Sequence, residues 1–259
     1  MRVTFLGTGA AANPDREQCS VAVEAEQQTL LFDVSSGTGI LRQLCAAGVD
    51  NSTIRHVFLS HSHFDHAGGL PPLMLALMEC GSPSLTVHGA RETLDAVRCS
   101  MYDELPGVEQ WMGERLAWDI MDSGEVFHVA GKTRVEAVAV DHTVPCLGYV
   151  ARDNGNSAAF SGDTRFCERL IAASEGCDLL VHEAAATEDM KEWLKMTGHS
   201  SARDAACAAR DAGARRLVLT HIDRESKYAG DLLEEASSVF DGPLRLAHDL
   251  MTITISDRR

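Results

Sequence analysis

The segment HVFLSHSHFDHAGGL, residues 56–70, places three histidines and an aspartate within six residues, directly after an apolar run. His61 and His63 lie two positions apart, so their side chains point the same way in an extended segment. Asp65 and His66 follow where AGGLPPLMLAL, with its two prolines, predicts the start of a helix. Two imidazoles then face one point, while a carboxylate and a third imidazole face a neighbouring point. Because Zn²⁺ and similar ions take these ligands, the segment predicts a metal site.

Three further candidate ligands each end an apolar, strand-like run. His142 ends VEAVAVDH, Asp163 ends AAFSGD and His221 ends RLVLTH. In layered α/β folds, functional sites assemble where strands end. Together with HSHFDH, these residues supply enough ligands for two metal ions.

Short apolar runs rich in β-branched residues recur along the chain and predict strands. Helical patterns with plausible caps lie between several of them, and we find no internal repeat and no linker. The order predicts an α/β fold with covering helices, formed by one domain over residues 1–259. The predicted strands are 2–7, 20–25, 29–34, 56–61, 84–89, 135–142, 158–163, 179–184, 216–221 and 251–256, and the predicted helices are 38–48, 71–81 and 201–214.

Charge and composition narrow the class of protein. The net charge of −15 over 259 residues gives little of the phosphate attraction on which nucleic-acid affinity depends. No apolar run reaches the roughly 18 residues of a membrane span, and the N-terminal sequence lacks a signal peptide. The eight cysteines form no CxxC pair. We therefore expect a soluble, cytoplasmic protein with free thiols and no membrane contact.

The glycines of GTGAAA, residues 7–12, fit a loose dinucleotide-binding pattern after the first predicted strand. That pattern requires a helix directly after the glycines, whereas ANPDREQ with Pro14 follows here. A glycine turn is the better interpretation.

The HSHFDH segment resembles the HxHxDH motif of the metallo-β-lactamase superfamily. The likeness covers nearly the whole chain, through TFLGTGAA, LLFDVSSGT, DHTVPCLGYV, FSGDTR and RLVLTHI. It is strongest to the ribonuclease Z-like branch. The resemblance implies an αββα four-layer sandwich with a dinuclear site. It also implies the ligands: His61, His63 and His142 for one metal, Asp65, His66 and His221 for the other, and Asp163 bridging both.

Two further segments resemble that branch: HEA at 182–184, with Ala185 in place of its threonine, and GHSSA at 198–202. The likeness implies that Glu183 orients His199 and that His199 donates a proton to the leaving oxygen. Histidine suits this role because it titrates near neutral pH, and a carboxylate partner fixes its tautomer. With Asp65, these two residues form the predicted catalytic set. Carboxylates can also support ligands from behind, which we expect of Asp33 and leave open for Asp249.

Two departures from ribonuclease Z guide the choice of substrate. The long glycine- and proline-rich arm that clamps transfer RNA is missing between His142 and Asp163, where RDNGN makes a short turn. The basic N-terminal loop keeps only Arg16. These departures and the acidic charge favour a small or cyclic phosphodiester, hence a small anionic partner rather than a large RNA.

The predicted activity is metal-dependent phosphodiester hydrolysis, with a metal-bridging hydroxide as nucleophile and His199 as general acid. Arylsulfatase, esterase or lactonase activity and transfer-RNA 3′ processing stay open as alternatives. A catalytically weak protein that binds a small ligand is a hypothesis of a different class. The expected cofactors are two divalent ions, Zn²⁺ in the first place, with Mn²⁺ or Fe²⁺ open. A homodimer is expected by analogy.

Residues outside this set receive structural interpretations. We interpret His56, His88, His128 and His248 as structural or exposed, because only residues with converging partners are assigned a metal role. Residues 100–118 could form a lid or a packed helix and loop, and packing is favoured because aromatic residues are commonly core residues.

Overall fold

Two seven-stranded sheets form the centre of the protein in this computed structural model, which describes residues 1–81, 84–223 and 225–256. The strands of the first sheet, in spatial order, are β14 (Thr252–Thr254), β1 (Arg2–Gly7), β2 (Ser20–Ala25), β3 (Gln28–Phe32), β4 (Ile54–Phe58), β5 (Leu85–Gly89) and β6 (Leu116–Ile120). Those of the second are β13 (Leu244–Leu246), β12 (Leu217–Thr220), β11 (Leu179–Glu183), β10 (Asn156–Phe160), β9 (Cys146–Asp153), β8 (Thr133–Val140) and β7 (Val126–Ala130).

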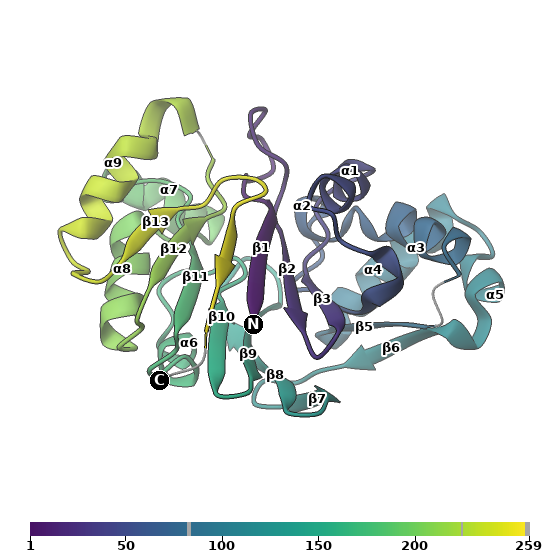
Figure 1. Cartoon of the computed structure of the whole chain (residues 1–259). Coiled ribbons are helices and arrows are strands. Elements are labelled where there is room, and N and C mark those ends of the chain that lie inside the picture. The colour runs from purple at the N-terminus through teal and green to yellow at the C-terminus, as the bar shows by residue number, and fades with distance from the viewer. Residues whose placement is uncertain (82–83, 224, 257–259) are drawn as a thin grey trace.

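Helices cover the outer side of each sheet (Figure 1). Beside the first sheet lie α1 (Gly39–Ala46), α2 (Phe64–Ala67), α3 (Leu70–Glu79), α4 (Arg91–Glu104) and α5 (Val108–Met112). Beside the second lie α6 (Glu168–Ala173), α7 (Lys191–Thr197), α8 (Ala202–Asp211) and α9 (Glu225–Ser237). Single 3₁₀ turns occupy Asn51–Thr53, Gly113–Arg115 and Glu188–Met190.

Three apolar clusters correspond to the interfaces between these layers. Phe5 and Phe32 of the first sheet meet Tyr149 and Phe160 of the second, and all four are nearly or fully buried. The rings of Phe32 and Phe160 stack with their centroids 4.2 Å apart. Two further clusters join each sheet to its own helices. The arrangement is the predicted αββα four-layer sandwich.

The strand directions bring the predicted site residues to one edge of the sandwich. Strands β10, β11, β12 and β13 are parallel. Strand β8 runs in the same direction, because it pairs antiparallel with β9, which pairs antiparallel with β10. His142, Asp163 and His221 therefore follow the same ends of β8, β10 and β12. In the first sheet, β3 and β4 are parallel and lead into Asp33 and the histidine segment.

Strands β9 and β10 form a tight hairpin where the ribonuclease Z arm was expected to be missing. Asn154 and Gly155 join them, with φ of 48° and 83°. Asn-Gly with both φ values positive is the preferred two-residue connection of a hairpin. The arm is thus replaced by a short turn at the far end of these strands from His142 and Asp163.

Residues 100–118 pack as the sequence favours. They form the end of α4, α5, a 3₁₀ turn and the start of β6. Met101, Val108 and Met112 lie in the cluster between the first sheet and its helices, whereas Trp111 is 52% exposed.

None of the helices in the described ranges has the length and apolar character needed to cross a membrane. All eight cysteines are free thiols, as predicted. The cytoplasmic location and the homodimer stay predictions.

Gly69, directly before α3, is a site where backbone approach excludes a side chain. A Cβ there would lie 1.9 Å from the Val34 carbonyl oxygen. We expect Gly69→Ala to lower the free energy of unfolding towards the upper end of about 1–3 kcal/mol, measured by urea denaturation. In the control Gly48→Ala, the added Cβ meets no atom within 4 Å, so only its left-handed backbone (φ 67°) costs about 1 kcal/mol. Equal losses in both variants would contradict the packing argument.

Candidate metal centre

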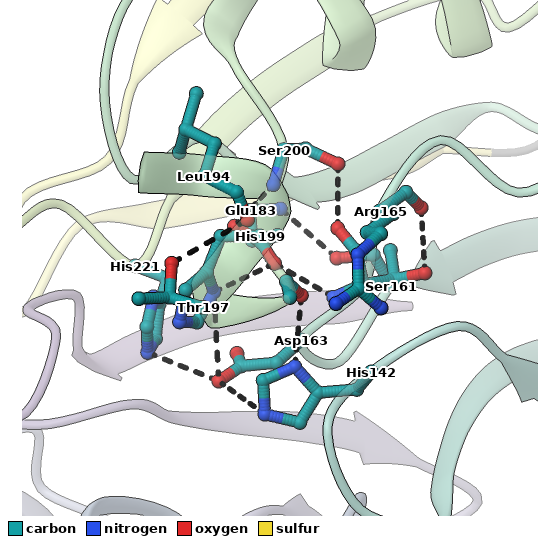
Figure 2. A network of polar contacts seen from close by, with 12 residues as sticks. His142, Ser161, Asp163, Arg165, Glu183, Leu194, Thr197, His199, Ser200 and His221 are labelled. Carbon is teal, nitrogen blue, oxygen red and sulfur yellow. Dashed lines mark hydrogen bonds and ion pairs between the residues drawn. The ribbon is translucent and has the colours of Figure 1, made fainter. Parts of the chain in front are cut away.

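The carboxylate of Asp163 lies at the centre of the converging side chains. Its Oδ2 atom is 3.3 Å from Nε2 of His66, 3.4 Å from Nε2 of His221 and 3.6 Å from Nε2 of His61. Nε2 of His142 lies 3.9 Å away. Figure 2 shows His142 and His221 approaching this carboxylate from different strands. A carboxylate in contact with imidazoles from both halves of the predicted ligand set has the position expected of a bridging ligand.

The first predicted metal subsite is brought together as one cluster. The ligand atoms of His61, His63, His142 and Asp163 all lie within 4.8 Å of one another. His61 Nε2 and His63 Nδ1 are 2.9 Å apart, and His63 Nδ1 and His142 Nε2 are 3.4 Å apart. Three imidazole nitrogens and a carboxylate oxygen thus face one point, which suits a tetrahedral ion such as Zn²⁺.

The second predicted subsite lies on the other side of Asp163. Asp65 Oδ2 is 3.5 Å from Nε2 of His66 and 3.5 Å from Nε2 of His221. The buried thiol of Cys19 groups with the same two histidines, within 4.8 Å. Sequence reasoning missed Cys19, because nothing in its spacing from HSHFDH indicates the proximity.

Two observations show that a metal ion fits these residues. Nε2 of His66, Nε2 of His221 and Oδ1 of Asp163 are buried without a hydrogen-bond partner, which is costly unless another group satisfies them. Burial also lowers the pKa of His61, His63 and His142, so each offers a neutral lone pair. Burial would raise the pKa of Asp163, but neighbouring His221 and His66 hold it well below its ordinary value. The donor set therefore fits divalent ions, and the individual ligand roles stay predictions.

Hydrogen bonds at Nδ1 fix the ring orientation of two predicted ligands, His66 and His142. His66 donates from Nδ1 to Asp33 Oδ2 over 2.7 Å, and Asp33 also accepts from the amide and hydroxyl of Ser60. His142 donates from Nδ1 to the Gly198 carbonyl oxygen over 2.8 Å. Asp33 and His221 each have a left-handed backbone with φ of 56°, an uncommon conformation that often marks functional sites.

The sequence left the role of Asp249 open. In the structure its carboxylate connects the C-terminal loop to the loop after β1. It accepts hydrogen bonds from the Thr8 hydroxyl and the Glu17 amide.

Replacing Asp33 with asparagine should weaken metal binding without removing a predicted ligand. The amide can no longer stabilise the His66 imidazole as a carboxylate does, and such outer partners are worth about 10–100-fold in metal affinity. A competitive chelator titration measures the change. Asp249→Asn is the control, because this carboxylate contacts loops; an equal loss there would contradict the assigned support by Asp33.

Glu183 and His199 form a separate pair beside Asp163. His199 donates from Nδ1 to Glu183 Oε1 over 3.0 Å, and Glu183 accepts from the amides of Thr164 and Ser200. Glu183 is fully buried. Burial alone would lower the pKa of His199, but the charge and hydrogen bond of Glu183 raise it to about 9. The imidazolium form is therefore stable at neutral pH.

A pocket of about 340 Å³ opens onto these residues. Besides His63, Asp65, Asp163, His199 and His221, it is lined by Ala10, Ala11, Ala12, Phe64, Ala185, Trp193, Thr197 and Asp223. The alanines of the glycine turn GTGAAA thus form part of the wall of this pocket. Sequence reasoning assigned no role to Phe64 or Trp193.

The family model "Beta-lactamase superfamily domain" matches residues 28–222. A ribonuclease Z of Methanosarcina acetivorans is 28% identical over an alignment that covers 100% of this chain and 99% of the relative. A ribonuclease Z of Myxococcus xanthus is 32% identical, with 98% of each chain covered. The first alignment spans 319 positions against 259 residues here, so the relative contains segments that this chain lacks.

Solved structures give the same result. A metallo-β-lactamase fold protein from Bacillus subtilis superposes with a TM-score of 0.83 at 24% identity, covering 98% of this chain and 99% of the other. The short form of human tRNase Z superposes with a TM-score of 0.80 at 26% identity, covering 99% and 100%.

The chain belongs to the β-lactamase superfamily. It is a metal-dependent hydrolase that resembles the ribonuclease Z-like branch, as the sequence indicated.

The expectation of a small anionic partner in place of a large RNA is wrong. Curated relatives that match over nearly their full length are named ribonuclease Z, which is the name of an enzyme that cleaves RNA. The physical reason lies in the two observations on which the expectation rested. Net charge averages over the whole surface, and a missing arm removes one means of holding an RNA. Neither feature determines which bond the site cleaves.

Proposed function

We propose that this protein is an endoribonuclease of the ribonuclease Z kind, which hydrolyses a phosphodiester bond at the 3′ side of a transfer-RNA precursor. The observation that carries the proposal is the combination of the Asp163-centred cluster with full-length similarity to ribonuclease Z. The similarity to human tRNase Z supports the same substrate class. Zn²⁺ is the proposed ion, since three histidines and a carboxylate around one point suit it well.

The residues divide the work of hydrolysis. When bound, two divalent ions would lower the pKa of water and neutralise negative charge on the phosphate. Asp163 would be shared between the two ions, and Asp65 would help to hold the second one together with His66 and His221. His199, protonated through Glu183, would give its proton to the departing oxygen from the pocket side.

The Glu183–His199 pair should set the alkaline limit of activity. A general acid must be protonated, so activity falls as pH rises through the pKa of His199, raised here to about 9. Glu183→Gln removes the charge that raises this pKa, and the alkaline limb of the kcat profile should therefore move to lower pH. Profiles of the metal-loaded variants measure the shift. The control is Glu188→Gln, at an exposed glutamate, which should not shift the alkaline limb of the kcat profile. If Glu183→Gln does not shift this limb either, the proposed effect of Glu183 on the pKa of His199 is contradicted.

The proposed function is tested with a transfer-RNA precursor that carries a 3′ trailer. Zinc-loaded protein should cut it once, endonucleolytically, whereas protein stripped of metal should not. A panel of p-nitrophenyl sulfate, p-nitrophenyl acetate and a cyclic nucleotide serves as comparison. An intact precursor together with rapid turnover of one of these small substrates would overturn the proposal.

A further inference from the structure

Two aromatic side chains line the pocket above the metal ligands. Phe64 lies between His63 and Asp65 in the chain, yet this residue is 62% exposed. It lines both the pocket of about 340 Å³ at the metal ligands and a smaller apolar hollow beside α4. Trp193 of α7 is partly buried against Ala185 and Leu194, and it lines the pocket at the metal ligands as well. Ligand pockets are commonly lined by aromatic side chains, so both rings are candidate ligand contacts.

The second aromatic ring is aligned with the proposed general acid. The Trp193 indole and the His199 imidazole are nearly parallel, at 22°, with their centroids 6.3 Å apart. His199 in turn lies nearly parallel to His221, at 24° and 5.1 Å. Trp193 therefore extends the row of planar rings outward from the site, next to the atom that would deliver the proton.

The described lining of the pocket disfavours one mode of RNA recognition. Among the lining residues that the structure describes there is no lysine or arginine, and Asp223 adds a carboxylate. Lysine or arginine salt bridges from this described lining therefore cannot position the substrate here. Stacking can, because every nucleobase has a π-face and aromatic rings bind it without regard to charge.

We propose that this pocket is a nucleobase-binding subsite in which Trp193 stacks on the base of the nucleoside that carries the leaving oxygen. The assignment of this side follows from His199: its proton goes to the leaving oxygen, and Trp193 lies alongside His199. Phe64, which lines the same pocket beside His63 and Asp65, would contact the nucleotide on the other side of the cleaved bond. The inference rests on the proposed function and adds how the bond is positioned.

The test uses one RNA in three versions, with a purine, a pyrimidine or an abasic residue on the leaving side. Wild-type protein should lose about tenfold to a hundredfold in kcat/KM on the abasic RNA. Trp193→Ala should show that loss already on intact RNA and little further loss on abasic RNA. Trp193→Phe should retain most activity. Trp111 is exposed and lies outside the pocket, so Trp111→Ala is the matched control for Trp193→Ala. Phe166 is likewise exposed and outside the pocket, so Phe166→Ala is the matched control for Phe64→Ala.

A binding measurement separates this inference from the proposed function. Guanosine monophosphate should quench the tryptophan fluorescence of metal-loaded wild-type protein but not of Trp193→Phe. Quenching without RNA cleavage would leave the subsite standing and overturn the proposed function. RNA cleavage with equal rates on intact and abasic RNA, and no quenching, would overturn the subsite alone. Metal content must be unchanged in Trp193→Ala, which shows that the variant has kept an intact metal site.

Discussion

Asp163→Asn should abolish activity, with kcat/KM falling by at least about a thousandfold, and should reduce bound metal below two ions per chain. The asparagine keeps the size of the side chain but loses the charge that four imidazoles approach within 3.9 Å. Outer partners of metal ligands are already worth about 10–100-fold, so a shared ligand should be worth more. Elemental analysis and RNA cleavage measure the two effects.

The control for this variant is Asp153→Asn. Asp153 is also a buried aspartate, but it accepts a hydrogen bond from Thr133 in the hairpins far from the ligands. It should change neither metal content nor cleavage. Full activity and two bound ions in Asp163→Asn would contradict the bridging role.

His199→Ala should lower kcat on RNA by about 10²–10⁴-fold while both ions stay bound. The variant removes the proton donor for a poor leaving group but none of the predicted metal ligands. Cleavage of bis(p-nitrophenyl) phosphate should fall far less, because p-nitrophenolate departs without protonation. Comparison of the two substrates therefore separates proton donation from metal binding.

His128→Ala is the control for this variant, since His128 lies in the edge strand β7, outside the pocket. Equal losses on both substrates in His199→Ala would indicate damage to the metal site. Full turnover of RNA would show that another group protonates the leaving oxygen.

The convergence of the candidate ligand side chains could be predicted from the sequence because its pattern is local, while their roles as ligands stay predictions. His61 and His63 follow the end of β4 at Phe58, and Asp65 and His66 lie in the short helix α2, so the segment carries all four side chains to one edge of the sheets. His142, Asp163 and His221 each end a strongly apolar run, and parallel strands bring such ends to one edge.

Elements whose pattern depends on tertiary contacts were missed. Strand β7 is an edge strand, half exposed, and so lacks a continuous apolar run. Strand β9 is buried on both faces but contains Gly148 and Arg152, which obscure the pattern. Gly148 is needed there, because a Cβ would lie 2.9 Å from the Phe160 carbonyl oxygen.

Cys19 and Trp193 illustrate the limit for functional residues. Each reaches the site through a separate loop or helix, at a distance in sequence that no spacing rule connects to HSHFDH. The substrate was misjudged for a related reason: charge and length describe the whole chain, whereas specificity arises from a few side chains around one pocket.

The most direct test of the two-metal site is an anomalous diffraction map of crystals grown with zinc. We expect two peaks on either side of the Asp163 carboxylate, one bounded by His61, His63 and His142 and the other by Asp65, His66 and His221. A single peak, or peaks that Asp163 does not contact, would contradict this expectation.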